Sequence, residues 1–120
     1  MTPRRLALAK AMGYTAQIVP NGGGFAWQLH LYGEPIGDLW QWEWGAWAVV
    51  PDIEQDVAAA IEALNATGEW WTLRRVPTKD KSPLYACNVE WALGKRGEAT
   101  SPSLAIFEAL YAYYKVEVEP

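Results

Sequence analysis

The sequence predicts a soluble α/β (α+β) protein with three helices and a small, mostly antiparallel sheet of about four to five strands. Segments with helical spacing of apolar residues follow segments in which apolar and polar residues alternate, and turn residues separate them. At 120 residues, 51% of them hydrophobic, the chain has the size and composition of one globular domain, 1–120, with one core. No apolar run approaches the roughly 20 residues of a membrane span.

The first predicted elements are a helix over residues 3–12 and a strand over residues 25–32. Thr2 is a suitable N-cap, Pro3 favours the first turn, and Gly13 favours the end of the helix. The stretch NGGG predicts a turn into the strand. In FAWQLHLY, one predicted face carries Phe25, Trp27, Leu29 and Leu31, and the other carries Ala26, Gln28, His30 and Tyr32.

The stretch LWQWEWGAW, residues 39–47, contains four tryptophans in nine positions. The residues GEPIG before it have the length of a hairpin connection, which predicts a second strand here. Alternation places Trp40, Trp42 and Trp44 on one face of that strand. Because each indole can remove about 150–250 Å² from water, three exposed ones would form a patch larger than a monomer usually tolerates. We therefore expect these three in the core, against the next helix, and leave the face of Trp47 open.

The middle of the chain predicts a helix and two more strands. Acids in the first turn of IEQDVAAAIEALNATG and Gly68 beyond its end mark the helix. Its inward positions are Ile53, Val57, Ala60, Ile61 and Leu64. WWTLRRV and LYACNVEWALG predict strands joined by the polar loop PTKDKSP. In the second of them, one face carries Tyr85, Cys87, Val89, Trp91 and Leu93, and the other carries Asn88 and Glu90.

The stretch GKRGE predicts a turn before a third helix, which Thr100 or Ser101 caps and Pro102 begins. Only one acidic residue interrupts the uncharged stretch SLAIFEALYAYY, and such a helix is typically buried on more than one side. One expectation is a homo-oligomer that covers this helix, and the alternative is cover by the first helix and the tail VEVEP. The expected oligomer contacts are Tyr111, Tyr113 and Tyr114.

A set of motifs along nearly the whole chain carries a family resemblance. The motifs are MGY after the first helix, a Trp-containing strand, PDIEQDVAAAIEAL, a second Trp-rich strand pair and GKRGEATSPSLAIFEAL. Together they resemble the phage ABA-sandwich domain family, whose lead into the last helix matches residues 99–106. The chain departs from it in the density of LWQWEWGAW and in the long VPTKDKSP loop. The resemblance implies a three-layer α-β-α sandwich, a bacteriophage or prophage origin, and no catalytic residues to carry over.

The composition offers few signals of catalysis or metal binding. His30 is the only histidine and Cys87 the only cysteine, so a zinc site lacks ligands and no intrachain disulfide can form. NGGG lacks the strand-before, helix-after context of a phosphate loop. The absence of disulfides and of a signal-peptide pattern predicts a reducing cytosol, and the family resemblance implies that it is the cytosol of the host bacterium. We expect no cofactor, no metal and no catalytic residues; an enzyme built on His30 and Glu43 is the least favoured alternative.

Charge is distributed in blocks: residues 34–69 hold eight acidic residues and no Lys or Arg, whereas residues 74–96 carry +4. The overall charge of −4 argues against general nucleic-acid binding. Two groups are candidate ligand contacts. The first is the polar sheet face of Gln28, His30, Gln41 and Glu43, with Asn88 and Glu90. The second pairs an indole that can stack on a base with guanidinium groups that can contact phosphate: Trp70, Trp71, Arg74 and Arg75.

These observations favour a small, non-enzymatic bacteriophage accessory protein that acts by stoichiometric binding in the host, as a counter-defence. The first hypothesis is that it sequesters a nucleotide-derived signal with the second group of contacts. The alternative is a protein-binding inhibitor of a host defence or nucleic-acid-binding protein, which uses the acidic surface of residues 34–69. We expect no membrane contact.

Overall fold

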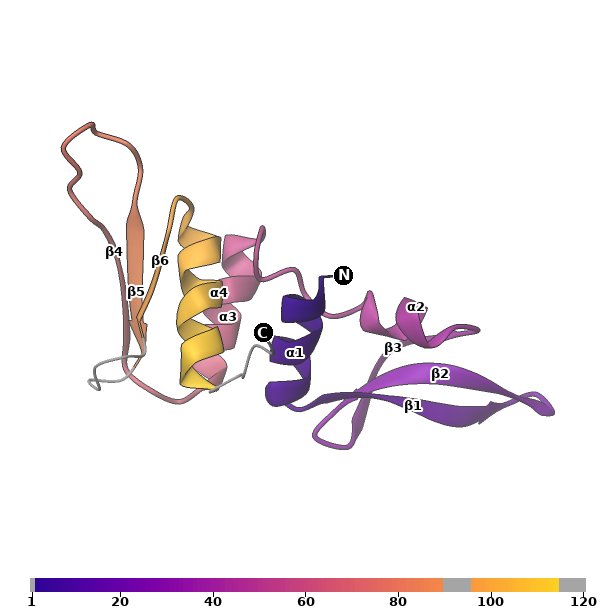
Figure 1. The fold of residues 1–120 in the computed structure, drawn as a ribbon. Helices are drawn as coiled ribbons and strands as arrows, with labels where there is room; N and C mark the ends of the chain where they lie inside the picture. The colour runs from indigo at the N-terminus through magenta and orange to yellow at the C-terminus, as the bar shows by residue number, and fades with distance from the viewer. Residues whose placement is uncertain (1, 90–95, 115–120) are drawn as a thin grey trace. The chain divides into compact units, whose positions relative to one another are not determined.

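The computed structural model describes residues 2–89 and 96–114 and divides the chain into two compact units, residues 1–51 and 52–120. We call them the N-terminal and C-terminal units and describe each by itself. In both, the described elements follow the order helix, three strands, helix (Figure 1). None of the helices in the described residues has the length and apolarity to cross a bilayer. The single domain over 1–120 stays a prediction.

The α+β class is confirmed, but the strand and helix counts differ from the prediction. The described residues form two separate antiparallel sheets of three strands each, with four helices. One extra strand, Tyr14–Asn21, was not predicted because Ala16 and Pro20 are weak strand formers. One extra helix, Glu43–Trp47, occupies part of the predicted tryptophan strand. The three-layer sandwich stays a prediction.

The N-terminal unit begins with the predicted helix, α1 (Pro3–Ala11). The Thr2 hydroxyl caps it by accepting a hydrogen bond from the Arg5 backbone N–H at 3.2 Å, and Gly13 beyond its end has a φ of +105°. Three strands then form an antiparallel meander in chain order. They are β1 (Tyr14–Asn21), β2 (Gly24–Leu31) and β3 (Glu34–Trp40).

The two hairpins of this sheet have two-residue turns. Gly22 and Gly23 close β1 and β2 with positive φ, so the turn predicted at NGGG is confirmed. Tyr32 and Gly33, with φ of 51° and 83°, close β2 and β3. The predicted five-residue connection GEPIG is therefore wrong, because its last four residues belong to β3.

The strand predicted through LWQWEWGAW ends at Trp40, and α2 (Glu43–Trp47) follows after two residues. Trp40, Trp42 and Trp44 are 39%, 70% and 65% exposed, so the prediction that all three lie in the core is wrong. Trp47 is the buried one, at 7%. The physical reason is that the strand ends at Trp40, so its alternation of sides does not extend to Trp42 and Trp44, and α2 instead turns Trp47 into the core.

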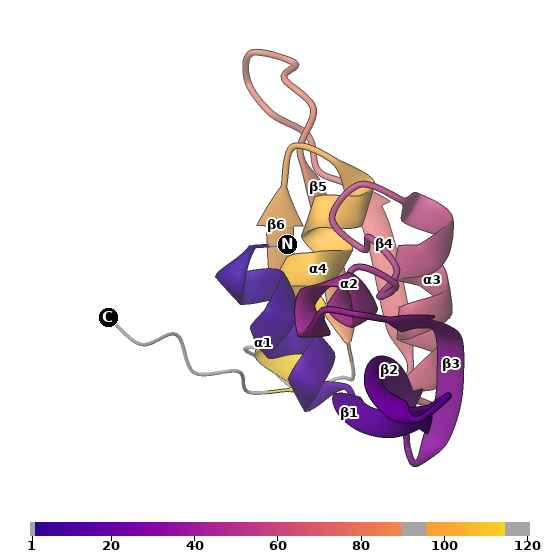
Figure 2. The same ribbon diagram turned by 90° about the vertical axis from the view of Figure 1, so that its right-hand side faces the viewer.

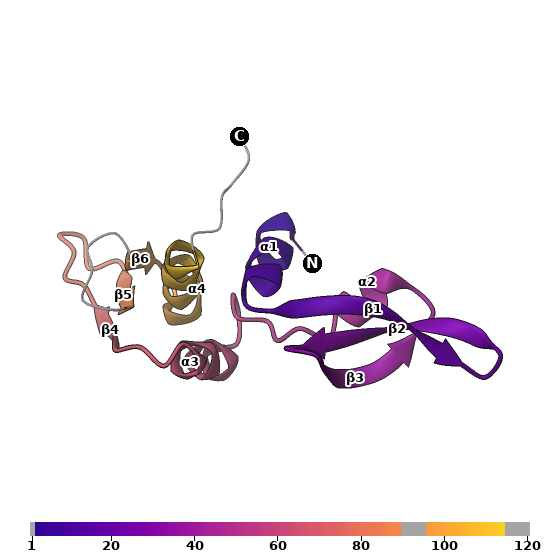
Figure 3. The same cartoon turned by 90° about the horizontal axis from the view of Figure 1, so that it is seen from below.

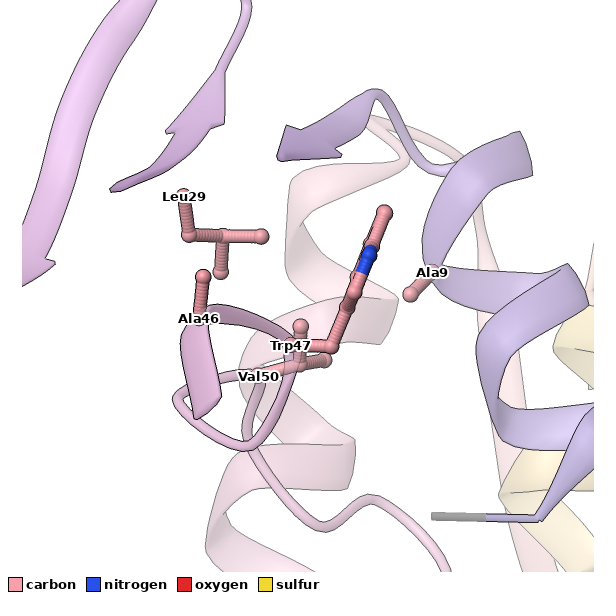
Figure 4. Close-up of a cluster of buried hydrophobic side chains, with 5 residues drawn as sticks. All are labelled: Ala9, Leu29, Ala46, Trp47 and Val50. Atoms are coloured by element: carbon pink, nitrogen blue, oxygen red, sulfur yellow. The ribbon is translucent and has the colours of Figure 1, made fainter. Parts of the chain in front are cut away.

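The core of the N-terminal unit lies where α1 and α2 meet one face of the sheet. Figure 4 shows the Trp47 indole standing between Ala9 of α1 and Leu29 of β2, with Ala46 and Val50 beside it. Further side chains pack against this cluster: Leu6, Tyr14, Ala16, Trp27, Ile36 and Val49. The apolar face predicted for β2 is buried at Leu29 but not at Phe25, which is 79% exposed near the hairpin turn.

The C-terminal unit begins with α3 (Val57–Ala66), four residues later than predicted. The Asp56 carboxylate caps it by accepting hydrogen bonds from the N–H groups of residues 58 and 59. Gly68, with a φ of +72°, follows its end as predicted. Three strands form the second meander: β4 (Trp71–Arg75), β5 (Tyr85–Val89) and β6 (Arg96–Ala99).

The stretch GKRGE is not simply a turn, because Arg96 to Glu98 belong to β6. The first two residues of that stretch lie outside the described residues, as do the predicted strand positions Glu90, Trp91 and Leu93.

The last helix is α4 (Pro102–Tyr113), and Ser101 caps it as predicted. The Ser101 hydroxyl accepts a hydrogen bond from the Leu104 N–H at 3.2 Å. It packs on β5 and β6 (Figure 2), and α3 lies beside it on the same side of the sheet (Figure 3). Gly97 permits the close approach, since a Cβ there would lie 2.3 Å from the backbone at residues 105 and 109. The strands and α3 therefore cover much of this apolar helix.

Candidate functional site

The N-terminal unit contains a pocket of about 370 Å³ between α1 and α2. α1 contributes Pro3, Leu6 and Lys10, which share one side of the helix by their spacing. α2 contributes Glu43, Trp44 and Trp47, and the two indoles are three residues apart on neighbouring positions of the helix. Thr2 completes the lining. The result is a mostly apolar hollow in the size range of small-molecule sites.

Two opposite charges face this pocket. The Lys10 ammonium lies 5.8 Å from the centroid of the Trp47 ring, which is within the range of a cation–π interaction. Glu43, at the first position of α2, supplies the carboxylate. Across the part of the chain that the structure describes, neither side chain forms an ion pair, with each other or with another residue. Both charges are therefore available to a ligand.

Next to the pocket lies a surface that we call the tryptophan–acid segment, residues 38–44. Trp42 and Trp44 are exposed on either side of Glu43, and Trp40 is partly exposed. Asp38 adds a second exposed carboxylate. Trp40 also packs on α2, because a Cβ on Gly45 would lie 2.6 Å from its ring. The segment therefore brings exposed indoles and exposed carboxylates within seven consecutive residues.

The predicted polar face of Gln28, His30, Gln41 and Glu43 is not assembled as a single face. His30 is 8% exposed, its Nδ1 lies 3.2 Å from the Gln28 carbonyl oxygen, and its register partner in β3 is Pro35. Gln41 lies in a bend after β3 and Glu43 in α2. The Gln28 amide donates to the Gly37 carbonyl at 3.3 Å. Among the described residues no hydrogen bond joins His30 to Glu43, the two residues of the least favoured enzyme alternative.

Asn88 does not extend that face either, because it belongs to β5 of the other sheet. Glu90, which was predicted beside it, lies outside the described residues.

The predicted nucleotide contacts are distributed over different sides of β4. Trp70 precedes the strand and is 74% exposed, whereas the half-buried Trp71 donates from its indole Nε1 to Asn65 Oδ1 at 3.1 Å. Arg74 and Arg75 are consecutive strand residues, so they point to opposite faces.

Of these four residues only Arg75 lines the second pocket, of about 410 Å³. Its other lining residues are Val76, Pro77, Thr78, Lys81 and Ser82.

The tyrosines predicted at an oligomer interface lie at the end of α4. Tyr111 is 8% exposed and stacks on Phe107 at 5.8 Å between ring centroids. Tyr113 and Tyr114 are half-buried and contact each other edge to face at 4.9 Å. The oligomer stays a prediction.

The buried Cys87 thiol is chemically quiet. It is fully buried under α4, and burial raises its pKa from 9.0 to about 11. The thiol therefore stays protonated at neutral pH, as the prediction of a core cysteine requires. In the described ranges, no group of three or more His, Cys, Asp or Glu side chains is placed to hold a metal ion.

No family model, no curated protein and no solved structure matches the chain. The phage ABA-sandwich resemblance accordingly stays a prediction carried by the sequence motifs.

Sequence reasoning missed the pocket between α1 and α2. Neither Leu6 nor Lys10 was predicted as a ligand contact. The signal was present in part, because the 3, 6, 10 spacing on α1 predicts one helix face. The second wall of the pocket comes from the helix at residues 43–47, where the alternating tryptophans had predicted a strand.

Proposed function

We propose that the protein is a non-enzymatic binding protein that captures a cationic protein segment on its tryptophan–acid segment. The observation that carries this proposal is the exposure of Trp42 and Trp44, at 70% and 65%, on either side of Glu43. Large exposed apolar patches on soluble proteins commonly mark interaction sites. Tryptophan is also the residue type most enriched among the energetic centres of protein interfaces.

The charge of this surface supports a cationic partner. Residues 34–47 contain Glu34, Asp38 and Glu43 but no Lys or Arg. Indole faces attract guanidinium and ammonium groups, with about 0.5–2 kcal/mol for each contact, and the carboxylates add charge-assisted hydrogen bonds. Opposite charge also accelerates the encounter. Arginine-rich or lysine-rich segments satisfy both features of the surface.

The sequence predicted protein binding through the acidic surface of residues 34–69, and this proposal uses only part of that surface. Its first three acidic residues belong to the N-terminal unit and its last five to the C-terminal unit. The N-terminal part places Glu43 between two exposed tryptophans, Trp42 and Trp44, whereas the C-terminal part has one exposed tryptophan, Trp70, beside Glu69. The phage-family resemblance supports a setting in the infected bacterial cytosol, where covering a basic nucleic-acid site would blunt a host defence protein.

The test is a titration of the purified protein with a fluorescently labelled oligoarginine peptide, followed by anisotropy at several salt concentrations. We expect saturable binding that weakens with salt. The double variant Trp42→Ala/Trp44→Ala should bind at least about tenfold more weakly, because two cation–π contacts are removed. Glu43→Gln should flatten the salt dependence.

The matched control is Trp70→Ala, which removes a tryptophan of similar exposure, 74%, from the other unit. It should leave peptide binding within about twofold of the unchanged protein. Equal losses in the control and the double variant, or no binding of the peptide at millimolar concentration, would contradict the proposal.

A second candidate function is binding of a nucleotide-derived ligand in the pocket at the end of β4, instead of at the full set of contacts that the sequence predicted. The favouring observation is that Arg75 and Lys81 both line this pocket, together with the hydroxyl-bearing Thr78 and Ser82. Guanidinium and ammonium groups are the usual partners of phosphate. A thermal-shift panel of cyclic nucleotides and ADP-ribose tests it: stabilisation that Arg75→Gln abolishes supports this candidate, and no response to any compound removes it.

A further inference from the structure

The pocket between α1 and α2 adds Pro3, Leu6, Lys10 and Trp47 to two residues, Glu43 and Trp44, that capture of a cationic segment also uses. Its walls are the apolar side chains Pro3 and Leu6 and the indoles of Trp44 and Trp47. The Trp47 indole is 7% exposed and belongs to the core, so this wall is fixed by packing. A ligand here would bury an apolar body against a preformed surface.

The charges of the pocket favour a ligand with two opposite charges. A purely cationic ligand would meet the Lys10 ammonium, and a purely anionic one would meet the Glu43 carboxylate. Neither charge forms an ion pair within the residues that the structure describes. A zwitterion can form charge-assisted hydrogen bonds with both groups at once, whereas a singly charged ligand can pair with only one of them.

We infer that this pocket binds a zwitterionic α-amino acid with an aromatic or large aliphatic side chain. In this assignment Lys10 binds the carboxylate, Glu43 accepts hydrogen bonds from the ammonium, and the apolar side chain lies against Leu6, Trp44 and Trp47. The volume of about 370 Å³ accommodates one such molecule. This site is distinct from the capture of a protein partner, although the two share Glu43 and Trp44.

The experiment is an NMR titration of the full-length protein that follows the tryptophan indole N–H resonances. L-phenylalanine is compared with phenethylamine, which lacks the carboxylate, with 3-phenylpropionate, which lacks the ammonium, and with N-acetyl-L-phenylalaninamide, which lacks both charges. We expect L-phenylalanine to shift the Trp44 and Trp47 resonances with a Kd below about 1 mM, and each analogue to bind about tenfold more weakly. The Trp70 resonance should not move.

Two charge-removing variants connect each ligand group to its residue. Lys10→Gln should weaken L-phenylalanine about tenfold but leave phenethylamine within about twofold of its affinity for the unchanged protein. Glu43→Gln should show the mirror pattern, with 3-phenylpropionate unaffected. Equal affinity for all four compounds, or shifts at Trp70 and not at Trp44 and Trp47, would overturn the inference.

Trp42→Ala separates this inference from the proposed function, because Trp42 does not line the pocket. The variant should retain binding of L-phenylalanine while losing affinity for the oligoarginine peptide. If L-phenylalanine at about 10 mM, tenfold above the expected limit of its Kd, shifts no indole resonance, the inference of an amino-acid site is wrong. That outcome does not affect the proposed binding of the oligoarginine peptide, which is measured separately.

Discussion

At the scale of single residues, small side chains decide how closely the elements approach. Gly97 in β6 lies directly beneath α4, where a Cβ atom would meet backbone atoms that cannot rotate away. Gly24 also lies in a strand, but a Cβ there would only reach an ordinary contact of 3.7 Å with the Asn21 carbonyl oxygen. The two glycines therefore have different physical roles.

We predict that Gly97→Ala destabilises the protein by about 1–3 kcal/mol or more, because α4 must move away from the sheet. Urea denaturation followed by circular dichroism measures the change. Gly24→Ala is the control and should stay within about 0.5 kcal/mol of the unchanged protein. Similar losses in both variants would show that the close approach at Gly97 is not the cause.

The Cys87 thiol gives a prediction for pH dependence. The pKa of the buried thiol is raised to about 11 from its ordinary value of 9.0, so the unfolded chain ionises first as the pH increases. Its stabilisation is therefore fully present below pH 9.0 and is lost as the pH rises towards about 11. The free energy of unfolding should fall by at most about 1.4 kcal/mol per pH unit from this group.

Cys87→Ala is the reference for that measurement, because other groups titrate in the same range. The difference in unfolding free energy between the two proteins should shrink as the pH rises from 9 to 11. A difference that stays constant across this range would contradict the assignment of the shift to burial.

At the scale of elements, capping residues set where the helices begin. The helix expected from Ile53 begins at Val57, because the Asp56 carboxylate satisfies the N–H groups of the first turn. Residues 53–55 instead form a turn, and Ile53 remains buried at 6%. The apolar spacing therefore predicted the burial of Ile53 correctly, although this residue lies in the turn and not in the helix.

We predict that Asp56→Ala destabilises the protein by about 1 kcal/mol, since the cap is lost. Asp56→Asn keeps an oxygen acceptor and should lose much less. Thermal unfolding of the two variants makes the comparison, and Glu62→Ala on the exposed side of α3 serves as the control for removing a negative charge. An equal loss in the alanine and asparagine variants would point to charge instead of capping.

At the scale of the whole molecule, the chain builds its two compact units from one element order. The buried cluster around Trp47 in the N-terminal unit is formed by Ala9, Leu29, Ala46 and Val50 (Figure 4). Cys87 reports on the C-terminal unit, since it is fully buried there. The two residues therefore provide separate probes for the two units.

We predict that Trp47→Ala destabilises the N-terminal unit by about 3–5 kcal/mol but leaves Cys87 protected from thiol reagents at pH 8. Amide hydrogen exchange measures the first effect and labelling by a chromogenic disulfide measures the second. Rapid labelling of Cys87 in this variant would instead support the prediction of one cooperative domain over residues 1–120.

The sequence by itself determined the local features of this protein. Cap and turn residues such as Thr2, Ser101 and Gly68 act over three or four positions, so their consequences for helix ends were predictable. The strands β2, β4 and β5 followed from alternation in the same way. These signals need no knowledge of distant residues.

Only the tertiary structure decided which aromatic residues are buried and which residues share a site. Alternation of apolar and polar residues predicts which face of a strand a side chain is on, but not whether another element covers that face. Trp42 and Trp44 lie outside the core because the strand stops at Trp40 and a helical turn brings Trp47 inward. The pocket joins α1 to α2 across about thirty residues of chain, and no local pattern connects them. Burial depends on what packs against a face, and that is settled only when distant segments meet.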